Sequence, residues 1–259
     1  MIPADARAIA VNPFVELDLG VLFRRVDLRG VAVVTSNWPI AAIVIPLGAT
    51  VDDLPGAVGA ARDAARGANV PAIAWWIAPQ HDHLAPGLEA LGIVQGDTPG
   101  FESVETAMAL DHEPVGGRVE GVEVRVVESF EDFAAAAFIL EQAFGLPVVS
   151  EDENRSLYAD YASPGNSARE YLAFVDGRPV GTAFAVGGTA AVNLFGGGVL
   201  EDARGRGVYR ALVQARWEDA VERGTPVLTV QAGRQSRPIL DRLGFEPILD
   251  ARMFVETLA

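Results

Sequence analysis

The chain has 259 residues and a formal net charge of −15, from 35 acidic and 20 basic side chains. Every basic residue is Arg, and there is no Cys. A chain without Cys has no disulfide framework, no thiolate nucleophile and no Cys-ligated metal site. Because so negative a charge repels phosphate backbones and anionic lipids, we expect neither a nucleic-acid nor a membrane partner.

The N-terminal residues do not have the pattern of a targeting segment. Asp5, Arg7 and Glu16 interrupt any apolar core of a signal peptide. The most apolar stretch, Val31–Ala49, is broken by Ser36 and Pro46 and is predicted to form strands rather than a membrane span. We therefore expect a cytoplasmic protein.

A weak internal repeat divides the chain. Ala64–Gly67 ends in Arg-Gly before a Pro and an apolar run, and Val221–Gly224 does the same in the second half. Further on, Leu88–Ile93 and Leu240–Phe245 share Leu-x-x-Leu-Gly. Each half is predicted to run helix, strand, short helix, glycine stop, strand. An alternating α/β chain can show such a rhythm without duplication, but the shared elements favour two related halves.

The turn-rich stretch His112–Gly117 follows an apolar run and is predicted to lie between the halves. The predicted domains are therefore residues 1–115 and 118–259.

The second half shows a regular succession of elements. Ser129 is predicted to cap a helix that ends at Gly145, and Asp176–Pro179 is predicted to be the turn of a hairpin. The predicted strands are Val122–Val127, Tyr171–Val175, Val180–Val186 and Ala190–Leu200. The predicted helices include the one after Ser129, which runs through Ala134–Phe144, and those over Asn154–Tyr161 and Gly207–Arg223.

The loop between the last of these strands and the last helix carries the chemistry. It reads Arg204-Gly205-Arg206-Gly207. Backbone N–H groups at a helix start lack internal partners and lie at the positive end of the helix dipole, so they suit a phosphate. Glycines let that backbone approach the ligand, and the two Arg residues add forked cationic donors. The loop therefore predicts an anion site.

Two nucleotide-binding motifs are excluded or disfavoured at this loop. A Walker A loop needs a Lys, and the chain has none. The dinucleotide fingerprint Gly-x-Gly-x-x-Gly fails because Arg210 stands at its last position.

The segment Arg204–Tyr209 resembles the acyl-CoA loop of the GNAT superfamily of N-acetyltransferases, Arg/Gln-x-x-Gly-x-Gly/Ala, and Leu243-Gly244-Phe245 stands where that family often has Leu-Gly-Phe. The resemblance implies an α/β fold of the α+β type, with a mixed, mostly antiparallel central sheet flanked by helices and here duplicated. It also implies acetyl-CoA as co-substrate and no metal. The positions it carries over as cofactor-binding are Val199, Leu200, Arg204, Gly205, Arg206, Gly207, Val208, Tyr209 and Ser236.

In the family, the pantetheine arm pairs like a strand in a gap beside the strand that leads into the loop. Gly196–Gly198 fits a β-bulge that opens such a gap. Ser236 matches a small residue that lies against the arm, and it is also a predicted N-cap. Tyr158 and Tyr161 lie on the helix that flanks the acceptor cleft in the family, which makes them candidates for substrate contact.

The chain departs from the family pattern at its proton-transfer positions. The family's usual Tyr acid falls on Leu240, and its usual carboxylate base falls near Asn193. Tyr209 replaces the last Gly/Ala of the loop, so its ring must turn away from the phosphates or donate its hydroxyl to one. The catalytic residues stay unassigned, with Asn193, Glu201 and Tyr209 as candidates and Glu201 or Asp202 as an acceptor reached through water.

The first half lacks the loop. Leu47–Asp52 stands opposite Arg204–Tyr209, and Asp52 and Asp53 lie where the diphosphate would be. Residues 1–115 are therefore predicted to be a degenerate GNAT-like domain without a cofactor site. His81-Asp82-His83 has no identifiable third ligand and is interpreted as a solvated loop rather than a metal site.

The function predicted from the resemblance is transfer of an acetyl group from acetyl-CoA to a primary amine. The acidic chain favours a cationic small molecule or peptide as acceptor, whose identity, like the oligomeric state, the sequence does not give. The alternative is a non-catalytic acyl-CoA-binding module, suggested by Leu240 and Asn193.

Overall fold

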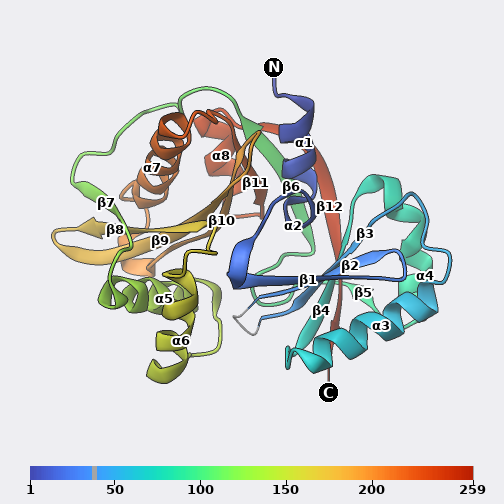
Figure 1. The fold of residues 1–259 in the computed structure, drawn as a ribbon. Helices are drawn as coiled ribbons and strands as arrows, with labels where there is room; N and C mark the ends of the chain where they lie inside the picture. Colours follow the sequence, from blue (N-terminus) through green and yellow to red (C-terminus); the bar gives the residue numbers. More distant parts are fainter. Residues whose placement is uncertain (37–39, 259) are drawn as a thin grey trace. The chain divides into compact units, whose positions relative to one another are not determined.

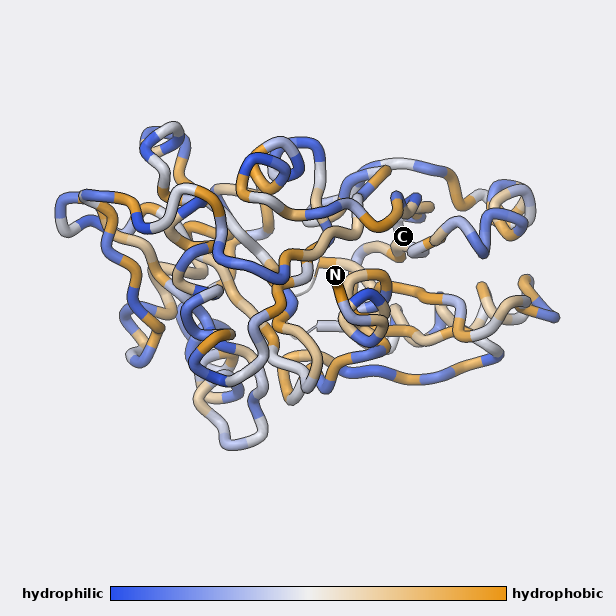
Figure 2. The backbone as a smooth tube through the Cα atoms, turned by 90° about the horizontal axis from the view of Figure 1, so that it is seen from above, coloured by the Kyte–Doolittle hydropathy of each residue, from blue (hydrophilic) through white to orange (hydrophobic). Residues whose placement is uncertain are grey.

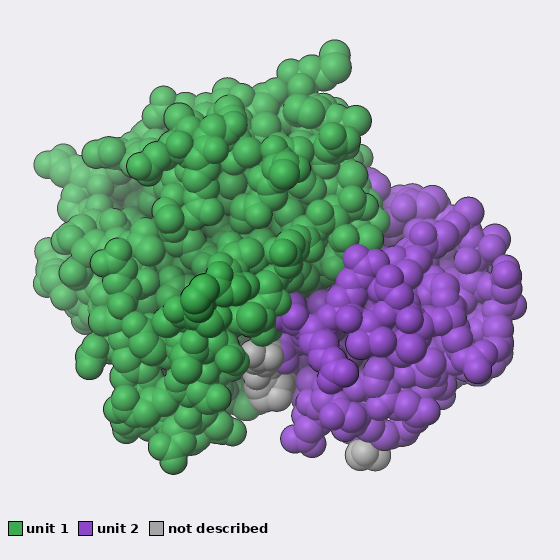
Figure 3. Space-filling model, in the orientation of Figure 1, with its two compact units in different colours: residues 1–22, 108–248 green, residues 23–107, 249–259 purple. Residues whose placement is uncertain are grey.

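The computed structural model describes residues 1–36 and 40–258, which form two compact units (Figure 3). Unit 1 consists of residues 1–22 and 108–248, and unit 2 of residues 23–107 and 249–259. The predicted boundary between residues 115 and 118 is therefore not a boundary between compact units.

An exchange of strands explains the difference. Strand β12 (Glu246–Thr257) comes from the end of the chain, yet it pairs antiparallel with β4 (Ala72–Ile77) in unit 2. Conversely, the end of strand β6 (Val104–Leu110) lies beside β11 (Leu228–Ala232) in unit 1, where Met108 and Leu110 are buried in the core. Each half of the sequence thus supplies the strand that completes the other unit.

The N-terminus also belongs to unit 1. Helix α1 (Ala4–Val11) lies against β11, and the Gln231 side-chain amide donates a hydrogen bond of 2.7 Å to the carbonyl of Ala10. The remaining elements of unit 1 are α2 (Pro13–Glu16), η1 (Gly20–Leu22), β7 (Val122–Val126), α5 (Phe130–Phe144), α6 (Glu151–Tyr161), β8 (Ala168–Val175), β9 (Arg178–Gly187), β10 (Val192–Val199), η3 (Glu201–Ala203), α7 (Val208–Glu222) and α8 (Arg237–Leu243).

The strand order of unit 1 is β6-β11-β10-β9-β8-β7. Strands β7 to β10 are antiparallel to one another, and β10 and β11 are parallel. Alternate residues of a strand face opposite sides of a sheet. On β8, Tyr171 and Ala173 pack with α7 and α8, whereas Leu172 and Phe174 pack with α5. The helices therefore cover both faces of the sheet (Figure 1).

Local chemistry sets the ends of these elements, and two of the three described next are where the sequence predicted. The Ser129 hydroxyl accepts a hydrogen bond of 3.1 Å from the N–H of Asp132, and α5 ends at Gly145 with φ 63°. Helix α6 begins earlier than predicted, because Ser150 and Glu153 form a capping box. Asp176 and Gly177 both have positive φ, which is the geometry of the type I′ hairpin turn between β8 and β9.

Unit 2 has the strand order β1-β2-β3-β4-β12, with β5 paired to β12. Strands β1 to β3 are antiparallel, and β3 and β4 are parallel. Its other elements are β1 (Phe23–Leu28), β2 (Val31–Ser36), β3 (Ala42–Pro46), α3 (Leu54–Gly67), η2 (Pro79–Leu84), α4 (Ala85–Ala90) and β5 (Val94–Gln95).

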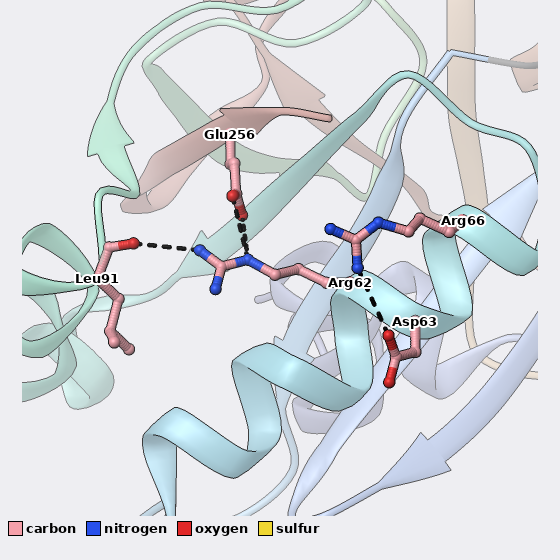
Figure 4. A network of polar contacts seen from close by, with 5 residues as sticks. All are labelled: Arg62, Asp63, Arg66, Leu91 and Glu256. Atoms are coloured by element: carbon pink, nitrogen blue, oxygen red, sulfur yellow. Dashed lines mark hydrogen bonds and ion pairs between the residues drawn. The ribbon is translucent and has the colours of Figure 1, made fainter. Parts of the chain in front are cut away.

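Helix α3 covers one face of this sheet through its small apolar residues, including Ala57, Ala61 and Ala65. On the same helix, Arg62 donates to the Glu256 carboxylate of β12 at 2.9 Å and to the Leu91 carbonyl after α4 at 3.1 Å (Figure 4). These contacts fix the C-terminal strand within unit 2.

The two units share a local arrangement. In unit 2, β3, α3 and β4 form a parallel β-α-β unit with three paired positions, and β10, α7 and β11 do the same in unit 1. Apolar and polar residues alternate along much of the chain (Figure 2), as expected where strands and helices bury one face. Within the part of the chain that the structure describes, no helix is long and apolar enough to cross a membrane.

Candidate functional site

A gap opens in the sheet of unit 1 where β10 and β11 part. The two strands pair only from Val192↔Leu228 to Leu194↔Val230, although β10 continues to Val199. Beyond that point the β10–β9 register shifts between Phe195 and Gly198, and Gly196 has φ 55°. The predicted bulge at Gly196–Gly198 is thus present, and it lies just beyond the last β10–β11 pair.

Glycine is required within the bulge. A Cβ atom at Gly196 would lie 2.8 Å from the Phe184 ring, and a Cβ atom at Gly197 would lie 2.7 Å from the Tyr209 ring. Aromatic side chains therefore approach the bulge from both faces of the sheet.

The loop at the end of the gap has the backbone that its sequence predicted. Gly205 and Gly207 have φ of 78° and 81°, and α7 begins at Val208 without a side-chain cap. The first N–H groups of such a helix have no internal acceptor and lie at the positive end of its dipole. Val208 itself is buried in the core, and the Leu200 N–H donates to Val180 at 2.9 Å. These two residues anchor the loop, and Arg204, Gly205 and Arg206 between them are exposed.

Both arginines of the loop are exposed. Arg204 donates from Nε to the Val199 carbonyl at 3.3 Å, and Arg206 forms an ion pair with Asp176 at 3.2 Å. Exposed ion pairs of this kind contribute little, about 0–1 kcal/mol, so an incoming phosphate can replace the Asp176 carboxylate at small cost. The arrangement can therefore hold an anion at the start of α7.

The ring of Tyr209 points away from the loop and toward the bulge. This is the first of the two predicted orientations, in which the ring turns away from the phosphates. Its ring contacts the Gly197 position and its side chain is hydrogen-bonded to Ser236. Burial raises the pKa of the Tyr209 hydroxyl, so this group is a proton donor rather than a base at neutral pH. Ser236 stands at the N-cap position of α8 but makes no side-chain capping bond, and donates instead to the Gly233 carbonyl at 3.4 Å.

Asn193 cannot accept a proton. It is fully buried, and its amide exchanges hydrogen bonds with Gln231 while its oxygen accepts from the Thr229 hydroxyl at 2.9 Å. This network joins β10 to β11 where they still pair. Glu201, the acidic candidate, is exposed in η3, and Asp202 pairs with Arg178 at 2.5 Å.

Tyr158 and Tyr161 brace α6 rather than present free hydroxyl groups. Their hydroxyls donate to the carbonyls of Glu128 and Val127 at 2.9 and 3.0 Å, and both rings pack against Phe133. The structure therefore places these tyrosines in the packing between α6, α5 and the end of β7.

Glu170 is a titratable residue that the sequence interpretation missed. Its carboxylate lies on β8 and accepts a hydrogen bond of 2.5 Å from the Thr182 hydroxyl. Burial raises its pKa to about 7, against the opposing effects of Thr182 and the Arg216 guanidinium. Glu170 precedes the strand predicted over Tyr171–Val175, and an acidic residue at that position looks the same in the sequence whether it is exposed or buried.

The corresponding loop of unit 2 is closed by its own side chains. The Asp53 carboxylate caps α3 by accepting from the Gly56 N–H at 3.0 Å, as predicted, whereas Asp52 accepts from the Thr50 hydroxyl at 3.1 Å. His81 is buried and its Nε2 donates to the Gly48 carbonyl at 2.9 Å, so it is not in the solvated loop that we predicted. Over residues 1–36 and 40–258, no three His, Asp or Glu side chains are grouped to hold a metal ion.

No protein-family model matches the chain, and no curated protein matches it in sequence. Its fold, however, matches solved structures over nearly all of its length. A GCN5-related N-acetyltransferase from Kribbella flavida has a TM-score of 0.68 at 17% identity, covering 98% of this chain and 96% of its own. Another from Sphaerobacter thermophilus has a TM-score of 0.63 at 19% identity, covering 90% and 82%.

The chain therefore has the mixed α/β fold of the GCN5-related N-acetyltransferases, which confirms the predicted resemblance and fold class. A tandem GNAT protein from the clavulanic acid biosynthesis pathway also shares the fold, with a TM-score of 0.58 at 16% identity over 88% of this chain and 78% of its own.

Proposed function

We propose that the chain is an N-acetyltransferase that moves the acetyl group of acetyl-CoA to a primary amine. The observation that carries the proposal is the gap between β10 and β11, which ends at an uncapped helix start with two positive-φ glycines and two exposed arginines. An extended pantetheine arm fits such a gap, and the diphosphate fits such a loop. Because acetyl-CoA is an intracellular metabolite, a cytoplasmic location accompanies the proposal.

Direct transfer needs the amine and the thioester held together, with hydrogen-bond donors for the developing oxyanion. The backbone of the bulge at Gly196–Gly198 lies beside the gap and can supply such donors. Tyr209 is the group we assign to protonate the departing thiolate, because its neutral hydroxyl lies between the bulge and Ser236. The usual family position for this acid holds Leu240, which is fully buried.

Titration of acetyl-CoA into the wild type and two variants by calorimetry tests the proposal. Arg206→Ala removes a charged donor to the diphosphate and is expected to weaken binding about 10-fold. Asp176→Ala is the matched control, because it removes the same ion pair but keeps the cation, and it is expected to bind as tightly as the wild type or tighter. A wild type that does not bind acetyl-CoA would refute the proposal.

The second candidate is an acyl-CoA-binding module without catalysis, favoured by buried Leu240 and by the internal bonds of Asn193. Release of free CoA in the presence of spermidine, benzylamine, glycinamide and an aminoglycoside separates the two candidates. These probes include cations because the net charge of −15 favours a cationic small molecule or peptide as acceptor. Binding without amine-dependent CoA release would leave only the module.

We further propose that unit 2 takes no part in acetyl-CoA binding, since its loop has no arginine pair and its helix is already capped by Asp53. Asp52→Ala is therefore expected to leave the dissociation constant of acetyl-CoA within about 2-fold of wild type, an energy change of about 0.4 kcal/mol. Calorimetry under the same conditions measures this. A loss of affinity of 10-fold or more would show that the unit 2 loop contributes to the site.

A further inference from the structure

Three residues form a row across unit 1 that leads to the bulge. Glu170 on β8 is paired with Phe184 on β9, and Phe184 is paired with Phe195 on β10, immediately before the register shift. Paired residues on neighbouring strands face the same side of the sheet. The rings of Phe184 and Phe195 stack at 5.1 Å on that side. Two strand spacings, about 10 Å, thus separate the Glu170 backbone from the gap.

Groups from three elements surround Glu170. The Thr182 hydroxyl of β9 donates to its carboxylate, and the Tyr161 hydroxyl of α6 accepts from its backbone N–H at 3.2 Å. From α7, the buried Arg216 guanidinium donates to the Phe184 carbonyl at 3.4 Å and acts on the carboxylate as a cation. The contacts nearest the bulge on this side are apolar, with Leu140 of α5 and Phe14 of α2 against the bulge residues.

This setting suits a proton acceptor. Glu170 as a residue is only partly buried, while burial of its carboxylate raises its pKa to about 7. A base whose pKa lies near the working pH is the most effective. Glu201 and Asn193 lack this setting, because Glu201 is exposed and the Asn193 amide is hydrogen-bonded to Gln231.

We propose that Glu170 is the proton acceptor of the acetyl transfer, held in place by the Thr182 hydroxyl; this rests on the function proposed above. The amine nitrogen forms a bond to the thioester carbonyl carbon, and one N–H proton passes to the Glu170 carboxylate through bridging water. The C–S bond breaks, and the thiolate leaves with its electron pair and takes a proton from the Tyr209 hydroxyl. Exchange with solvent then returns a proton to Tyr209 and removes one from Glu170.

The pH dependence of CoA release tests this proposal, with benzylamine and glycinamide as probes. Because the two amines differ in basicity, a limb of kcat/KM that stays at the same pH with both belongs to the enzyme. In the wild type this limb is expected to rise with pH through about 7, as Glu170 loses its proton. Glu170→Gln is expected to lower kcat at least 100-fold and to remove the limb.

Thr182→Val supplies a readout that a merely structural role would not change. It removes the hydroxyl that stabilises the charged carboxylate, so the limb is expected to move to higher pH, a shift that a loss of packing alone would not produce. Acetyl-CoA affinity measured by calorimetry serves as the control, and it is expected to be unchanged in both variants.

The outcomes separate the two proposals. If the wild type transfers acetyl groups and Glu170→Gln keeps both the rate and the limb, Glu170 is not the acceptor, although the proposed function stands. The same conclusion follows if Thr182→Val leaves the limb where it was. A wild type that binds no acetyl-CoA and releases no CoA overturns both proposals.

Discussion

Gly207→Glu is expected to lose acetyl-CoA binding, with an affinity at least 100-fold below wild type. Gly207 has φ 81°, and a Cβ atom there would lie 2.9 Å from Val119 Cγ1. The substitution therefore forces the start of α7 to shift and also adds a carboxylate where we place the diphosphate. Calorimetric titration with acetyl-CoA measures the effect.

Gly224→Ala is the matched control for this variant. Gly224 follows α7 at its other end with φ 77°, and nothing lies within 4 Å of a Cβ atom placed there. It carries the same kind of backbone strain, about 1 kcal/mol, at a distance from the loop. We expect lower stability but unchanged acetyl-CoA affinity. If Gly207→Glu binds within 3-fold of wild type while remaining folded, the loop is not the diphosphate site.

Glu105→Gln is expected to stabilise the protein strongly at alkaline pH. Glu105 on β6 is buried, and this burial raises its pKa to about 8. The Glu102 N–H donates to the carboxylate at 3.2 Å and lowers the pKa, but its effect is smaller than that of burial. The folded state therefore holds a proton that the unfolded state releases above its ordinary pKa of 4.5. Stability contributed by this group falls as pH rises from about 4.5 to about 8 and is constant above that.

The neutral amide removes this dependence. The gain in unfolding free energy is expected to be near zero at pH 4.5 and on the order of 5 kcal/mol at pH 9. Denaturant unfolding at both pH values measures it. Glu89→Gln, on the exposed surface of α4, is the control and is expected to change stability by less than about 0.5 kcal/mol at either pH. An equal gain at both pH values for Glu105→Gln would contradict the burial of a neutral carboxyl group.

Local signals in the sequence were sufficient for the elements and the loop. Ser129, Gly145 and the Asp176-Gly177 turn each fix the backbone within a few residues, so the helix cap, the helix end and the hairpin are where they were predicted. The glycines of the bulge and of the loop have the positive φ or close contacts that explain why glycine stands there.

Long-range pairing was not predictable in this way. Nothing local in Glu246–Thr257 indicates that it pairs with Ala72–Ile77 rather than with a strand of its own half. For the same reason, Glu170 was not recognised, because its burial and its bond to Thr182 depend on the neighbouring strand and on α7. The hydroxyl partners of Tyr158 and Tyr161 likewise come from residues some 30 positions earlier.

The exchanged strands have a consequence for how this chain can be divided. A cut between residues 115 and 118 would leave the first piece without β12 and the second piece without β6, so each would expose the unpaired edge of a buried strand. Neither half of the sequence contains all of one unit. The sheet of unit 2 can therefore be complete only after Glu246–Thr257 has been synthesised, although most of unit 2 precedes most of unit 1 in the sequence.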